Sequence, residues 1–60
     1  MDYGTKVRVM RAVRGLSQTD LADVSGVASY HLSLIESGKF LPGEEAARQI
    51  RISLGWPAKR

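Results

Sequence analysis

The chain has 60 residues, with nine Lys and Arg, six Asp and Glu, one histidine and no cysteine. This length allows one domain with a small core, and the composition excludes disulfides, thiolate metal sites and a zinc site made by histidine alone. The formal net charge of +3 suits a polyanionic partner such as nucleic acid. The sequence has no run of about 18 apolar residues, so no membrane-spanning helix is predicted.

The first predicted helix spans residues 3–14. Apolar residues recur there at spacings of three and four, which predicts one buried face: Tyr3, Val7, Met10 and Val13. Basic residues occupy the remaining surface: Lys6, Arg8, Arg11 and Arg14. Arg14 is a candidate for contact with a phosphate, while Lys6 and Arg8 are equally compatible with a plain solvated surface. Gly15 ends the helix, as a glycine just past the last turn commonly does.

A second helix is predicted to start after Ser17, which is a favoured N-cap residue. Asp20 lies three residues further on, where an acidic side chain can complete a capping box. Leu21 and Ala22 are predicted to face inward. The helix ends before Gly26, which can take a positive φ in the turn without steric cost.

A third helix is predicted from about Ala28 to Ser37, and Gly38 ends it. Its inner face is apolar and consists of Ala28, Leu32 and Ile35. The residues predicted to point outward are Tyr30, Ser33, Leu34 and Ser37, with Ser29 on the N-terminal flank. His31 lies beside the inner face, so we expect it to pack against a helix or cap one rather than bind a ligand.

Residues 39–43 form a predicted loop because Pro42 cannot continue a helix, and we expect Phe40 or Leu41 to pack under the bundle. Glu44 and Glu45 then place acidic groups at the positive end of a fourth helix. Its predicted buried face consists of Ala46, Ala47, Ile50 and Leu54, and Gly55 and Pro57 end it. Residues 48–54 also alternate somewhat like a strand, but the acidic start and the spacing of the apolar face favour a helix.

One motif covers the second and third predicted helices. It consists of L-S-Q-x-x-L-A from Leu16 to Ala22, then Gly26 and Val27, then Leu32, Ile35, Glu36, Gly38 and Lys39. This motif resembles the helix-turn-helix of the Cro/CI-type family, which includes the lambdoid phage repressors and the Xre-like regulators. The resemblance extends from about Val7 to Leu54 and is most specific over 16–39. It implies an all-α fold in which residues 1–60 form a single domain, a small four-helix bundle like the DNA-binding domain of lambda repressor.

The resemblance also implies roles for individual residues. The positions that contact bases in the family correspond to Ala28, Ser29, Tyr30 and Leu34, and the hydroxyl of Ser33 lies on the same predicted face. The residues expected at phosphates are Gln18, Ser37 and Lys39, together with Arg14. Arg11 and Glu36 match a pair that joins the first and third helices in the family. The alternative is that both are solvated surface charges.

Several positions depart from the family pattern. Ala28 stands where a Ser or Thr N-cap is usual, so the third helix either starts without a cap or is capped by Ser29. Ser29 and Tyr30 replace the commoner Arg or Gln, and Leu34 replaces a polar residue but can contact a thymine methyl. Because few bidentate groups remain, we expect DNA shape to contribute more than direct base contacts.

Ile52 and Trp56 are four residues apart and are predicted to point away from the core. They are candidates for a dimer interface; alternatively, Trp56 folds back onto its own bundle. We expect a homodimeric, repressor-like regulator that binds double-stranded DNA through residues 28–37, without a cofactor, a metal or a membrane partner. The sequence has no nucleophile–base set and no phosphate-binding glycine loop, so we do not expect an enzyme.

A second function stays open, namely a protein-interaction module such as an antitoxin or adaptor that uses the same fold. The small number of base-contacting groups and the pair of Ile52 and Trp56 favour it. The first ten residues, MDYGTKVRVM, lack the apolar segment of a secretory signal. Together with the absence of cysteine, this leads us to expect a cytoplasmic protein.

Overall fold

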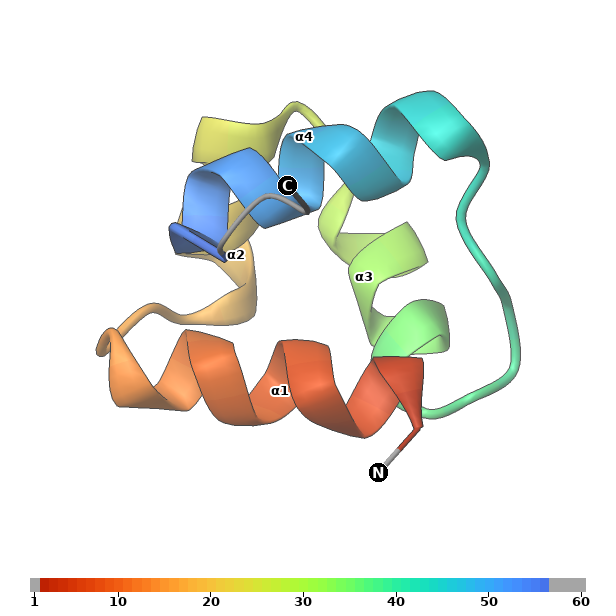
Figure 1. The fold of residues 1–60 in the computed structure, drawn as a ribbon, viewed down its shortest axis with the longest axis horizontal. Coiled ribbons are helices and arrows are strands. Elements are labelled where there is room, and N and C mark those ends of the chain that lie inside the picture. Colours follow the sequence, from red (N-terminus) through yellow and green to blue (C-terminus); the bar gives the residue numbers. More distant parts are fainter. Residues whose placement is uncertain (1, 57–60) are drawn as a thin grey trace.

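The computed structural model describes residues 2–56, and these residues form four helices and no strand (Figure 1). The helices are α1 (Tyr3–Val13), α2 (Gln18–Ser25), α3 (Ser29–Glu36) and α4 (Glu44–Leu54). Every predicted helix is present within a residue or two of its predicted bounds, and residues 48–54 are helical rather than extended. The prediction of an all-α fold is confirmed.

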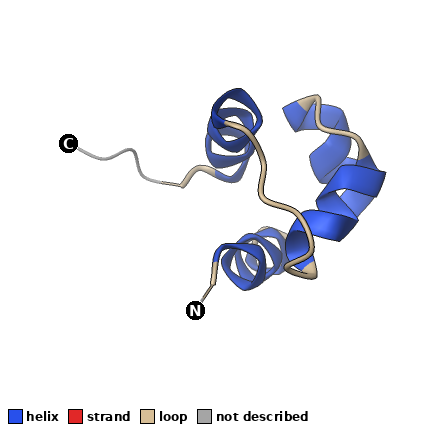
Figure 2. Cartoon of the chain, turned by 90° about the vertical axis from the view of Figure 1, so that its right-hand side faces the viewer, coloured by secondary structure: helices blue, strands red, loops and turns tan. Residues whose placement is uncertain are grey.

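The four helices form a small bundle. Figure 2 shows α1 and α4 on one side, with α2 and α3 facing them from the other. The pairs that pack together are α2 with α4, α1 with α3, and α2 with α3. The long segment after α3 runs along one end of the molecule to reach α4 (Figure 2).

The core is made by one or two large side chains from each helix. The fully buried apolar residues are Val7, Leu21, Leu32, Ile35, Ile50 and Leu54. Each of them falls on the apolar face that helical periodicity predicted for its segment. Because burying one such side chain stabilises a fold by only about 1.5–3 kcal/mol, a core of this size leaves a large share of the stability to helix caps and polar contacts.

Gly4 allows α1 and α3 to approach each other backbone to backbone. It is buried in the first turn of α1. A Cβ atom added there would overlap the carbonyl oxygen of Ile35 and crowd that of Glu36. Nothing in the sequence pattern marked this glycine, because its role depends on where two helices cross.

Some residues that were expected in the core lie on the surface. Val13 is 75% exposed. The chain reaches it from Val7 in two steps of three residues, through Met10, and each step falls about 60° short of a full helical turn. Val13 is therefore rotated about 120° away from the side of the helix on which Val7 lies. Phe40 and Leu41 are also exposed, so the prediction that one of them packs under the bundle is wrong. The loop lies against the end of the bundle without inserting a side chain into the core.

Candidate nucleic-acid interface

The outer face of α3 is exposed and carries hydroxyl groups. Tyr30 is 69% exposed, and Ser29 and Ser33 are exposed beside it. The inner face of the same helix is fully buried at Leu32 and Ile35. Ala28 is exposed at the start of the helix, so the prediction that it lies on the inner face with Leu32 and Ile35 is wrong, because it precedes the first helical turn. Leu34 is half-buried and therefore still partly accessible. Four of the five predicted base-contacting residues thus share an open surface, and the fifth lies at its edge.

The start of α3 is not capped by a side chain. Ala28 occupies the N-cap position with φ −58° and ψ 140°, and no side chain accepts a hydrogen bond from the first turn. Ser29, which was considered as an alternative cap, lies inside the helix as its first residue. The N–H groups of this first turn are therefore available to water or to a ligand.

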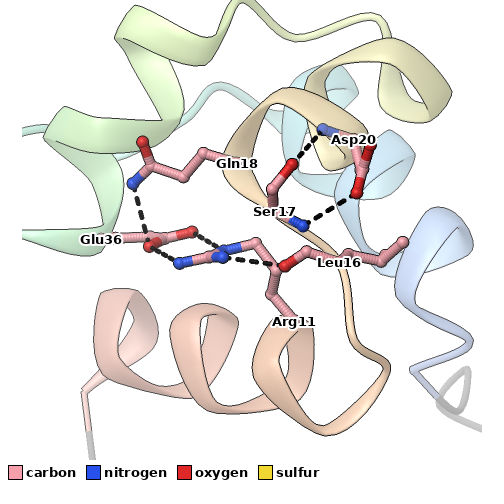
Figure 3. Close-up of polar contacts among 6 residues, drawn as sticks. All are labelled: Arg11, Leu16, Ser17, Gln18, Asp20 and Glu36. Carbon is pink, nitrogen blue, oxygen red and sulfur yellow. Dashed lines mark hydrogen bonds and ion pairs between the residues drawn. The ribbon is translucent and has the colours of Figure 1, made fainter.

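The C-terminal end of α3 is held by the ion pair expected between Arg11 and Glu36. Arg11 Nε donates to Glu36 Oε2 at 2.8 Å, and Arg11 Nη2 donates to Oε1 at 2.9 Å (Figure 3). The two side chains are only 16% and 4% exposed, so they are not solvated surface charges. The hydrogen bond to Glu36 raises the pKa of Arg11, and a bidentate pair of this kind fixes orientation as well as distance.

The same cluster reaches the start of α2. Arg11 Nη1 donates to the carbonyl oxygen of Leu16 at 2.9 Å. Gln18 Nε2 donates to Glu36 Oε1 at 3.2 Å (Figure 3). One of the two N–H groups of the Gln18 amide is therefore used inside the protein, and the other remains for a phosphate.

The N-terminus of α2 has the predicted capping box. Ser17 Oγ accepts from the Asp20 N–H at 3.0 Å, and Asp20 Oδ2 accepts from the Ser17 N–H at 3.1 Å (Figure 3). The cap removes one free N–H from the first turn and adds a carboxylate beside it. This makes the start of α2 less favourable for a phosphate than an uncapped helix start would be.

The predicted phosphate-contacting residues do not all lie together. Lys39 is exposed on the loop that follows α3. Ser37 is exposed too, but its hydroxyl donates to the Leu34 carbonyl at 3.1 Å, which leaves it only acceptor capacity. The guanidinium of Arg14 lies beside Gly55 at the end of α4. Since the segment after α1 and the loop after α3 lie at opposite ends of α1 (Figure 1), Arg14 and Lys39 belong to different surfaces.

His31 joins this surface to the loop through an aromatic stack that the sequence did not indicate. Its ring is 5.6 Å from that of Phe40 at an interplanar angle of 17°, and 5.2 Å from that of Tyr30 at 40°. His31 is exposed, so the expected role in packing against or capping a helix is wrong. The stack instead fixes the loop that carries Lys39 against α3.

The predicted dimer candidates are separated in the structure. Ile52 is 61% exposed, as expected. Trp56 does not lie beside it: its ring stacks on Tyr3 at 5.7 Å, and Lys6 Nζ lies 5.0 Å from the ring centroid. Gly55, with φ 67°, turns the chain back, so the alternative in which Trp56 folds onto its own bundle is correct. Ile52 remains as the exposed apolar residue of α4.

Within residues 2–56, no helix is both long and apolar enough to cross a bilayer. The same part of the chain contains no cluster of three His, Asp or Glu side chains arranged to hold a metal ion. Comparison of the chain with protein-family models, curated proteins and solved structures found no match.

Proposed function

We propose that this chain is a sequence-specific, double-stranded DNA-binding regulator of the repressor type, with α2 and α3 as its helix-turn-helix. The observation that supports this most is the contrast between the two faces of α3. Leu32 and Ile35 are buried while Tyr30 and Ser33 point outward. The major groove of B-DNA is wide enough for one helix, and this helix offers it a polar, accessible side.

The chemistry of this face favours modest direct readout. Ser29, Tyr30 and Ser33 bring hydroxyls, each able to donate or accept one hydrogen bond at a base edge or phosphate. None of them forms the bidentate contact that Arg or Asn makes with a base. Discrimination between sites then depends largely on groove width and DNA deformability, with Leu34 available to a thymine methyl.

Contacts with phosphate would position the helix. Lys39 is held near α3 by the stack of Phe40 on His31, and its backbone N–H donates to the Leu34 carbonyl at 2.9 Å. The second N–H of Gln18 and the uncapped first turn of α3 can add neutral donors. Arg14 would reach DNA only if the duplex curved around the other end of α1.

A gel-shift series over salt concentration tests the proposal. DNA affinity should fall steeply with salt, and Lys39→Ala should weaken binding to every sequence and lower the slope of log K against log salt by about one. Tyr30→Ala should change which duplexes are selected from a random pool. Arg48→Ala is the matched control, because Arg48 pairs with Glu45 on α4. Affinity that does not depend on salt, or equal effects of Lys39→Ala and Arg48→Ala, would refute the proposal.

The second candidate function is a protein-interaction module, such as an antitoxin or adaptor. The exposed Ile52 on α4 favours it, because an exposed apolar residue on a small domain suits a partner surface. The same residue suits the homodimer that a two-fold DNA site requires. Sedimentation at two concentrations, with Ile52→Ser alongside, tests the homodimer. An interaction module would bind no duplex at any salt concentration.

A further inference from the structure

Three exposed aromatic rings form one surface that joins α3 to the loop after it. Tyr30 and His31 lie in α3, and Phe40 lies in the loop. The ring of His31 is 5.2 Å from that of Tyr30 and 5.6 Å from that of Phe40, so the three rings are continuous. We call them the aromatic surface.

The rings of the aromatic surface stay accessible, although apolar rings usually pack into a core. Tyr30 is 69% exposed and Phe40 is 43% exposed, and His31 is exposed as well. The loop stacks Phe40 on His31 and leaves part of the Phe40 ring open to solvent. Contiguous exposed apolar groups on a small domain commonly mark a binding surface.

The charges in this part of the chain favour an anionic partner. Lys39 directly precedes Phe40 and is exposed, and its N–H donates to the Leu34 carbonyl at 2.9 Å, which ties it to α3. Between residues 24 and 44 the sequence has one carboxylate, Glu36, and it is buried in an ion pair. No other acidic group of this segment offsets the charge of Lys39.

We propose that the aromatic surface binds single-stranded DNA, which goes beyond the duplex binding proposed above. Unpaired bases expose flat π faces that stack on aromatic side chains, and a cation beside the rings holds the phosphates of the same strand. The ring of His31 already contacts both neighbours, so we place the bases on Tyr30 and Phe40. Lys39 then contacts a phosphate of that strand.

The stacking chemistry sets how this binding relates to the duplex. Every base has a π face, so stacking selects unpaired bases without selecting a sequence. Tyr30 also belongs to the side of α3 proposed for the major groove, so a single strand and a duplex should exclude each other. Binding of the single strand does not depend on the duplex proposal.

Fluorescence anisotropy with a labelled oligo-dT strand of about eight residues, at low salt, tests the surface. The matched probe is an abasic strand of the same length, which has the same phosphates but no bases. We expect a Kd of about 0.1–1 mM for the dT strand and at least about tenfold weaker binding of the abasic strand. Equal affinity for the two strands, or no saturable binding of the dT strand, would overturn the proposal.

Two variants test the rings directly. Phe40→Leu and Tyr30→Leu each remove a ring but keep an apolar side chain, so each should weaken binding of the dT strand about fivefold or more and leave the abasic strand unaffected. Equal weakening of both strands would mean that the change acts only by displacing Lys39, which would overturn the stacking.

The control for these variants is Leu41→Ala, because Leu41 is exposed in the same loop and has no ring. It should leave both affinities unchanged. The dispersion of NMR spectra shows that each variant is folded. Equal loss of dT affinity in Phe40→Leu and Leu41→Ala would also overturn the aromatic surface.

The contribution of charge is measured separately over a series of salt concentrations. Lys39→Gln should lower the slope of log K against log salt for the dT strand by about 0.7. Lys6→Gln removes the same charge from a lysine whose Nζ lies 5.0 Å from the Trp56 ring centroid, so it should leave the slope unchanged. Equal slopes in the two variants would overturn the contact of Lys39 with phosphate.

The same measurements separate this proposal from the proposed function. A wild-type chain that bound the dT strand but no duplex would support the aromatic surface and refute duplex binding. A chain that bound duplexes but did not distinguish the dT strand from the abasic strand would do the reverse.

Discussion

The two ends of α3 are held in different ways. At its C-terminal end, Glu36 is buried and receives hydrogen bonds from Arg11 and Gln18, and Gly4 lets the α1 backbone lie directly against it. At its N-terminal end, Ala28 provides no cap, and the residues that follow are exposed.

The two ends of α3 therefore have different structural roles. The C-terminal end sets the direction of α3 through contacts with α1 and α2. The N-terminal end leaves its backbone N–H groups uncapped and its side chains exposed, which suits the contact with phosphates and base edges proposed above. We call the C-terminal end of α3 the fixed end and its N-terminal end the open end. The following substitutions alter one of these ends or the loop beside them, in order of expected effect.

Glu36→Gln should have the largest effect. It keeps the shape of the side chain but leaves the guanidinium of Arg11 without a counterion in a largely buried position. Breaking a buried pair from one side costs about 3 kcal/mol or more, which approaches the whole stability expected for a core of this size. Urea denaturation followed by circular dichroism at 25 °C should show the unfolding midpoint moved close to zero urea.

The control for this prediction is Glu45→Gln, because Glu45 pairs with Arg48 on the surface. It should change stability by no more than about 0.5 kcal/mol. The double variant Arg11→Met with Glu36→Leu should recover much of the loss, since two apolar side chains leave no unpaired charge. If Glu36→Gln were as harmless as Glu45→Gln, the fixed end would not depend on this ion pair.

Gly4→Ala should have the next largest effect on the fixed end. The added methyl group would meet the carbonyl oxygen of Ile35, which is backbone and cannot move aside easily. Overpacking of this kind costs about 2 kcal/mol, although alanine favours the helix itself. Thermal unfolding measures the loss. Gly43→Ala is the control, because a Cβ there meets nothing within 4 Å, and equal loss in both variants would contradict the close approach.

Ala28→Ser should stabilise the open end. A serine hydroxyl at this N-cap can accept from a free N–H of the first turn, which is worth about 1 kcal/mol. Amide hydrogen exchange at Tyr30 and His31 should slow as that turn frays less. The same change at Ala12, an exposed helical position, should instead destabilise by about 0.5 kcal/mol. Equal effects at both positions would mean that the start of α3 is not limited by its missing cap.

Phe40→Ala should have the smallest effect on stability. It removes the stack on His31, which contributes about 0.5 kcal/mol at an exposed position. The loop would then be less firmly attached to α3, so we expect faster exchange of the Lys39 amide. Leu41→Ala is the control, since Leu41 makes no such stack, and identical exchange of the Lys39 amide in both variants would show that the stack does not hold the loop.

Local patterns allowed much of the fold to be predicted. The capping box needs only Ser17 and Asp20, which are three residues apart, so its geometry follows from the sequence of a single helix start. The buried positions of each helix follow from periodicity in the same way. The ion pair of Arg11 with Glu36 joins distant segments, and it was expected only because the motif resembles a known family.

The features that escaped prediction depend on how the helices meet. Gly4 matters only because α1 crosses α3 at that residue, and the sequence of α1 alone does not reveal the crossing. His31 and Phe40 meet because the loop doubles back along α3. Trp56 was placed on the surface by its spacing from Ile52, yet it leaves the helix after Gly55 and joins Tyr3.

The stack of Trp56 on Tyr3 has a consequence for protein engineering. It brings a side chain near the beginning of the described chain together with one near its end, with ring centroids 5.7 Å apart. A short glycine–serine connection could therefore join the two ends, and new termini could be opened in the exposed stretch around Phe40, as circular permutation generally requires.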